Sequence, residues 1–105
     1  MMVSDNHEDI VLLAPEIPEI LVRRYKILRK IYYSSPLGRR SLAAYFQVGE
    51  RVLRREIETL REQGLISVSS KGMFLTASGK SLVASITPFL KSFLGLTVLE
   101  EKLLK

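Results

Sequence analysis

The fold is decided by residues 39–64, which read RRSLAAYFQVGERVLRREIETLREQG. Within this stretch, segments 39–46 and 50–63 both place apolar residues at helical spacing, and Gly64 stands where a helix ends. Only Gln47-Val48-Gly49 separates the two segments, a turn too short for the helices to pack in parallel. We therefore predict a helix-turn-helix.

The segments on either side of this pair complete a small domain. Apolar residues recur at intervals of three and four before it, whereas after Gly64 the period changes to two. The expected elements are a helix from about Glu16 to Tyr33, strands at 65–69 and 73–75 around a turn at 70–72, and a helix from Ala77 capped by Thr76. The apolar face of the first helix is expected to comprise Ile17, Ile20, Leu21, Tyr25, Leu28, Ile31 and Tyr32. The prediction is a mainly α fold with a small two-stranded β-hairpin, a winged helix-turn-helix with an extra C-terminal helix.

Three segments are expected along the chain. Residues 1–14 have no clear apolar period and many acidic side chains, so we expect a flexible acidic arm. Residues 15–94 should form the winged helix-turn-helix domain, and residues 95–105 a linker helix. An apolar stripe begins at Leu82 and is expected to break near Pro88. Whether this stripe packs against the first helix or forms a dimer contact stays open.

The composition excludes several classes of protein. A chain of 105 residues with 47% apolar residues suffices for one domain and is too apolar for a disordered chain. No cysteine and one histidine exclude disulfide scaffolds, cysteine nucleophiles, and zinc sites built on cysteine or paired histidines. The absence of cysteine and of a basic-then-apolar leader leads us to expect a cytoplasmic location.

The charge is unevenly distributed along the chain. The formal net charge is +5, but residues 1–20 carry −5, residues 21–80 carry +9 and residues 81–105 carry +1. A positive net charge favours a polyanionic partner. The separation therefore indicates a basic, polyanion-binding body behind an acidic N-terminal segment.

The third helix, 50–63, concentrates arginines on the face opposite its apolar side. Its buried side is expected to comprise Leu53, Ile57 and Leu60. At 100° per residue, Arg51 and Arg55 project away from that side, with Arg54 on the flank. An arginine can donate two hydrogen bonds to guanine, and recognition helices present their N-terminal residues to base edges. We predict base contacts for Arg51 and Arg55 and groove-edge positions for Glu50 and Arg54. Ordinary surface ion pairs with Glu58 are the alternative.

Two further sites are expected to hold the DNA backbone. Arg39, Arg40 and Ser41 begin the second helix, where free N–H groups and the helix dipole favour a phosphate. Lys71 at the hairpin tip is expected to contact the backbone or the minor groove. The alternatives are a simple N-terminal cap by Ser41 with solvated arginines, and a solvated lysine in the turn.

These motifs also carry a family resemblance. Residues 48–57, VGERVLRREI, resemble the helix-turn-helix of DeoR-type repressors. GRRSL at 38–42, ERVLR at 50–54, GM at 72–73 and LT at 75–76 are more similar to the SorC family of bacterial sugar-responsive repressors. The resemblance extends from about Pro15 to Thr76, with glycine at position 49 where the family pattern has a serine cap.

The resemblance implies a DNA-binding domain of a repressor of sugar or glycolytic genes. Double-stranded operator DNA would be its partner, and the full-length protein would be a homo-oligomer. A phosphorylated sugar, fructose-1,6-bisphosphate for the glycolytic regulators, would bind a larger effector domain outside these 105 residues. No cofactor is expected in this chain.

Other functions find less support in the sequence. Gly79-Lys80-Ser81 matches the end of a P-loop, which needs glycine where Phe74 stands, and His7 lies near Asp9 without further ligands. We therefore expect neither catalysis nor a metal site. A winged-helix protein-interaction module without DNA binding would need an apolar exposed third helix. A membrane-surface protein is not expected, because the helix it would use has an apolar face suited to the core; its basic residues are Arg23, Arg24, Lys26, Arg29 and Lys30.

Overall fold

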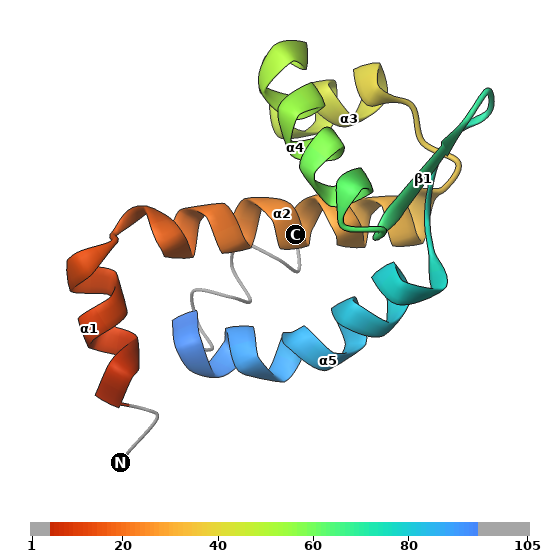
Figure 1. Ribbon diagram of the computed structural model, residues 1–105. Helices are drawn as coiled ribbons and strands as arrows, with labels where there is room; N and C mark the ends of the chain where they lie inside the picture. The colour runs from red at the N-terminus through yellow and green to blue at the C-terminus, as the bar shows by residue number, and fades with distance from the viewer. Residues whose placement is uncertain (1–4, 95–105) are drawn as a thin grey trace.

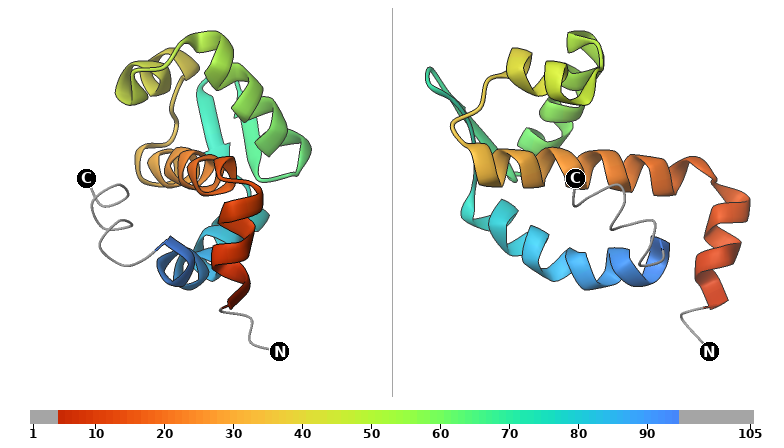
Figure 2. Two further views of the ribbon diagram at one scale, coloured as in Figure 1. Left: turned by 90° about the vertical axis from the view of Figure 1, so that its left-hand side faces the viewer. Right: turned by 180° about the vertical axis from the view of Figure 1, so that it is seen from behind.

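The computed structural model describes residues 5–94, and the predicted linker helix at 95–105 lies outside them. The elements in order are α1 (Asp5–Leu13), α2 (Glu16–Ser34), α3 (Arg39–Phe46), α4 (Glu50–Glu62), β1 (Ile66–Ser69), β2 (Gly72–Leu75) and α5 (Ala77–Leu94). The long helix α2 is central: α3 and α4 lie on one side of it and α5 on the other (Figures 1 and 2). This arrangement confirms the predicted winged helix-turn-helix.

The helix-turn-helix forms as its local sequence predicts. Gly38 and Gly49 are the extended residues that precede α3 and α4, and Gln47 ends α3 in the left-handed conformation, with φ of 56°. This single left-handed residue turns the chain sharply enough for α4 to begin three residues later. Gly64, with φ of +75°, lies directly after α4 and ends this helix, as expected.

The main core lies between α2, α3, α4 and the hairpin. Its buried residues are Ile27, Leu28, Ile31, Leu42, Ala43, Leu53, Ile57, Leu60, Ile66, Met73 and Leu75. The predicted apolar face of α2 was wrong at two positions, since Tyr32 is exposed and Ile27 is buried. α2 is covered on two sides, so its buried surface is wider than one stripe and includes Ile27.

The segment that we expected to be a flexible acidic arm contains a helix, which the sequence pattern did not predict. α1 spans Asp5–Leu13 and lies at the end of α2 remote from the hairpin (Figure 1). Ile10 to Leu13 are four consecutive apolar residues and therefore show no helical period. A helix is nevertheless favoured, because the segment's acidic residues precede these apolar ones and complement the N-terminal end of the helix dipole.

Part of the C-terminal apolar stripe packs against α2, whereas Phe89 of the same stripe is exposed, so the dimer contact stays a prediction. Tyr25 of α2 and Leu90 of α5 are buried together, and the hydroxyl of Tyr25 is hydrogen bonded to that of Thr87 on α5. The expected break near Pro88 does not occur, since α5 continues to Leu94. Pro88 removes one helical hydrogen bond to Ala84, but Ala84 is exposed, so water can bond to its carbonyl.

The hairpin is anchored at both ends. β1 and β2 are antiparallel, with Ile66 opposite Leu75, and β2 also pairs with the loop after α2 through two backbone hydrogen bonds between Leu37 and Met73. Thr76 caps α5 as predicted: its hydroxyl accepts a hydrogen bond from the Gly79 N–H at 3.0 Å and donates one to the Gly64 carbonyl at 2.6 Å. The β1–β2 hairpin, which is the wing of the fold, is therefore held to α2, α4 and α5.

Candidate nucleic-acid interface

The first two turns of α4 present three exposed arginines. Arg51, Arg54 and Arg55 are all exposed, whereas Leu53, Ile57 and Leu60 on the other side of the helix are buried. This confirms the predicted orientation of α4. The contacts that these arginines make with DNA stay a prediction.

These three guanidinium groups have no ion pair or side-chain hydrogen bond with any residue in the part of the chain that the structure describes. The alternative that Glu58 neutralises them is therefore wrong, because Glu58 lies 3.9 Å from Arg61 at the other end of the helix. An arginine without an internal partner keeps all five donors available for a ligand. The N-terminal half of α4 is thus suited to a polyanion.

The start of α3 lies beside the start of α4. Arg39, Arg40 and Ser41 are exposed in the first turn of α3, and the Nε of Arg40 is 4.0 Å from Oε2 of Glu50. Gly38 occupies the cap position, and no side chain caps the helix. The capping alternative for Ser41 is therefore wrong, and the first N–H groups of α3, which no side chain caps, suit a phosphate.

Lys71 lies at the tip of the wing. It is exposed, and its backbone N–H donates to the Ser69 hydroxyl, which fixes the turn. The wing rises on the same side of α2 as α3 and α4 (Figure 1; Figure 2, both views). The structure therefore places on this side of α2 the three elements that carry the eight predicted residues, all of them exposed: Arg39, Arg40, Ser41, Glu50, Arg51, Arg54, Arg55 and Lys71.

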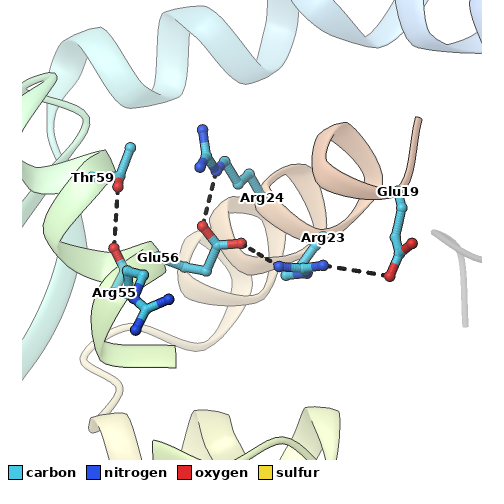
Figure 3. A network of polar contacts seen from close by, with 6 residues as sticks. All are labelled: Glu19, Arg23, Arg24, Arg55, Glu56 and Thr59. Carbon is cyan, nitrogen blue, oxygen red and sulfur yellow. Dashed lines mark hydrogen bonds and ion pairs between the residues drawn. The ribbon is translucent and has the colours of Figure 1, made fainter. Parts of the chain in front are cut away.

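One charged cluster behind α4 was not predicted. Glu56 is buried, with 7% of its side chain exposed, and it accepts hydrogen bonds from two arginines of α2 (Figure 3). Arg23 Nη1 lies 2.8 Å from Oε2, and Arg24 Nε lies 3.0 Å from Oε1. We call Glu56, Arg23 and Arg24 the α2–α4 ion cluster. It fixes the middle of α4 on α2 behind the arginines of the exposed face.

The other cations of α2 stack on aromatic rings. Lys30 Nζ lies 4.0 Å from the centroid of the Tyr45 ring, and Lys26 Nζ lies 5.6 Å from that of Phe46. Both rings belong to α3. Arg29 stacks on Tyr33 within α2 at 5.2 Å. These contacts weigh against the membrane-surface alternative, because they draw the cations it needs into the domain. Within residues 5–94, no helix is long and apolar enough to span a membrane.

A signal for the α2–α4 ion cluster was present in the sequence. Glu56 stands between Leu53 and Ile57 and projects about 60° from the centre of the buried side of α4. A carboxylate so close to a buried face needs a cationic partner. The adjacent Arg23-Arg24 pair was the available one, although periodicity alone could not assign it.

Comparison with known proteins agrees with this architecture. Residues 20–90 match the family described as CggR N-terminal DNA binding domain. The chain belongs to this family. The match includes α3, α4, the hairpin and every residue of the candidate interface, and it confirms the resemblance inferred from the motifs at 38–42 and 50–54.

Two relatives carry the name Central glycolytic genes regulator. The chain is 41% identical to the protein from Bacillus subtilis and 42% identical to that from Priestia megaterium, each over 91 residues. The alignments cover 87% of this chain but 27% of each relative. The chain therefore spans about a quarter of the length of these regulators.

Proposed function

We propose that this chain is the sequence-specific DNA-binding module of a bacterial transcriptional repressor of glycolytic genes. The observation that carries the proposal is the group of exposed, unpaired guanidiniums on the first two turns of α4: Arg51, Arg54 and Arg55. They follow a tight turn and project from a helix whose opposite face is buried. The family and the names of its relatives support the same function.

In this proposal α4 is the recognition helix and enters the major groove. Arg51 and Arg55 lie one turn apart and donate to the O6 and N7 acceptors of guanines, while Arg54 and Glu50 lie at the groove edge. The start of α3 holds a phosphate through Arg39, Arg40, Ser41 and free N–H groups, and Lys71 of the wing holds another. The backbone contacts set the register in which the arginines read bases.

A winged-helix protein-interaction module is the competing function. Such a module would bind a partner through an apolar exposed α4, whereas the exposed face of α4 is dominated by charged side chains. Exposed cations at three places on one side of α2 complement a regularly spaced polyanion better than a protein surface. Duplex DNA is therefore the better-supported partner.

The salt dependence of binding tests the proposal. We expect the chain to bind duplex DNA in a fluorescence anisotropy titration, with log Kd depending linearly on log salt concentration. About six phosphate contacts would give a slope of about −5 for the association constant. Absence of binding at low salt would refute the proposal, and binding to anionic lipid vesicles instead would favour the membrane-surface alternative.

A substitution at Arg51 tests its role in base recognition. Arg51→Ala should weaken binding to a selected duplex by about 1–3 kcal/mol more than binding to a scrambled duplex. Arg61→Ala, at the C-terminal end of the same helix, is the matched control and should not change this difference. Equal losses on both duplexes would make Arg51 a phosphate contact.

What we propose about a larger regulator rests only on the relatives of this chain. We infer that sugar-phosphate control and homo-oligomer formation involve regions beyond the residues aligned here, since the alignment covers 27% of each relative. Fructose-1,6-bisphosphate should then leave the DNA affinity of this 105-residue chain unchanged at constant ionic strength. An effect on affinity that inorganic phosphate does not reproduce would place an effector site within this chain.

A further inference from the structure

Val52 is an apolar side chain in an exposed position on α4. It is 47% exposed. The three other aliphatic residues of this helix are buried, with 4% exposure or less: Leu53, Ile57 and Leu60. A single exposed valine on a protein surface is ordinary. Val52 differs because it lies in the first turn of the helix that the proposed function places in the major groove.

Arginines lie on one side of Val52, and the buried carboxylate of Glu56, four residues further on and paired with two arginines of α2, lies on the other. Val52 follows Arg51 in the chain and lies about 60° from Arg55 around the helix axis, one turn before it. Neither arginine has an ion pair with another residue of the described part of the chain, so both are available to a polyanion. Val52 therefore neighbours two arginines that are proposed to contact DNA. DNA bound by these arginines would meet the methyl groups of Val52.

Internal packing accounts for the nearest exposed valine but not for Val52. Val48 lines a shallow hollow together with Val22 and Phe46, so its side chain faces α2 and α3. Val52 is not among the residues that line this hollow. About half of the Val52 side chain is exposed to solvent.

We propose that Val52 reads the 5-methyl group of a thymine that neighbours a guanine contacted by Arg51 or Arg55. The inference rests on the proposed DNA-binding function and deepens it by naming a base. In the major groove, thymine differs from cytosine by its methyl group and its O4 acceptor, and apolar side chains recognise the methyl. The α4 surface would thus combine hydrogen bonding to guanine with apolar contact to thymine.

Replacement of thymine by deoxyuridine tests this contact, because it removes the 5-methyl group and leaves the base pair intact. The probe is the tightest-binding duplex that the chain selects from a randomised library. Each thymine is replaced in turn, and the Kd is measured by anisotropy for the wild-type chain and for Val52→Ala. Val11→Ala is the matched control, since Val11 is also exposed, at 36%, but lies on α1 at the remote end of α2.

The wild-type chain should lose about fourfold in affinity at one thymine in each bound site, as for one methyl group returned to water. Val52→Ala should bind the unmodified duplex more weakly and show no further loss at that thymine. Val11→Ala should behave as the wild type. The sensitive thymine should neighbour a guanine whose replacement by 7-deazaguanine, which lacks N7, also weakens binding.

The outcomes separate this inference from the proposed function. Tight, selective duplex binding without a methyl-sensitive thymine would overturn the role of Val52 and leave the DNA-binding function standing. The same loss at deoxyuridine in Val52→Ala as in the wild type would also overturn it. Failure to bind or select any duplex would instead refute the proposed function itself.

Discussion

At the scale of single residues, Glu56 determines how α4 is held. Its carboxylate is buried and bonded to two guanidiniums, each with 39% of its side chain exposed. Removing a carboxylate from water is costly, and charged hydrogen bonds to both oxygens offset that cost. The resulting pairing orients α4 on α2 more specifically than apolar contacts alone would.

Substitution of Glu56 should therefore destabilise the domain. Glu56→Ala leaves Arg23 and Arg24 without their shared acceptor and should lower the free energy of unfolding by about 1–3 kcal/mol. The loss is smaller than for a fully buried pair because both guanidiniums can turn to solvent. Urea denaturation monitored by circular dichroism measures the change.

Glu58 provides the control on the same helix. Its carboxylate is half exposed and 3.9 Å from Arg61, so Glu58→Ala should change the free energy of unfolding by less than about 0.5 kcal/mol. Equal effects of the two substitutions would show that the α2–α4 ion cluster adds nothing beyond a surface ion pair.

At the scale of elements, the wing depends on a close approach between β2 and the loop after α2. Gly72 has φ of +132°, and a Cβ atom built at this position would lie 2.9 Å from the backbone nitrogen of Leu37. Only glycine meets both conditions without strain. Gly72 therefore allows β2 to pair with the loop at Leu37 and sets the angle at which the wing leaves the domain.

Gly72→Ala should loosen the wing. We expect a loss of about 1–3 kcal/mol in the free energy of unfolding, because the new methyl group meets backbone atoms and φ is unfavourable for alanine. Thermal unfolding measures this loss. Ser70→Ala in the same exposed turn is the control and should have little effect. A Gly72→Ala variant as stable as the wild type would show that the loop at Leu37 moves freely.

The sequence predicted the elements whose signals are local. The glycines that flank α4 and the spacing of Leu53, Ile57 and Leu60 were sufficient to predict this helix. The change of apolar period after Gly64 was sufficient to predict the hairpin. The run at 10–13 hides the period of α1, so that helix was missed. Glu56 was missed because its partners lie 32 and 33 positions away in the chain, which only the folded structure reveals.

At the scale of the whole molecule, the acidic N-terminal segment and the basic wing lie at opposite ends of α2. α1, which belongs to the acidic segment, lies at the end of α2 remote from the wing (Figure 1). Interactions between exposed charges are screened beyond about 8 Å at physiological ionic strength. The position of a charge should therefore matter more for DNA binding than its contribution to the net charge of +5.

A matched set of neutralising substitutions tests this. The double variant Asp9→Asn, Glu16→Gln removes two negative charges near α1 and should change the Kd for a scrambled duplex by less than about twofold at 0.15 M salt. Glu50→Gln removes one charge at the start of α4 and should raise the affinity more than the double variant, as measured by anisotropy. A larger effect of the double variant would mean that the acidic segment repels DNA over a long range.

The hydroxyl of Thr76 has a mechanical consequence. It bonds to Gly64 after α4 and to Gly79 in the first turn of α5, and Gly79 packs so closely on the Leu65 carbonyl that a Cβ would collide with it. The end of α4, the base of the wing and the start of α5 therefore form one rigid joint. α5 spans 18 residues from this joint and also packs on α2 through Leu90. A force applied to α5 would therefore reach α4 and the wing both through the joint at Thr76 and through α2.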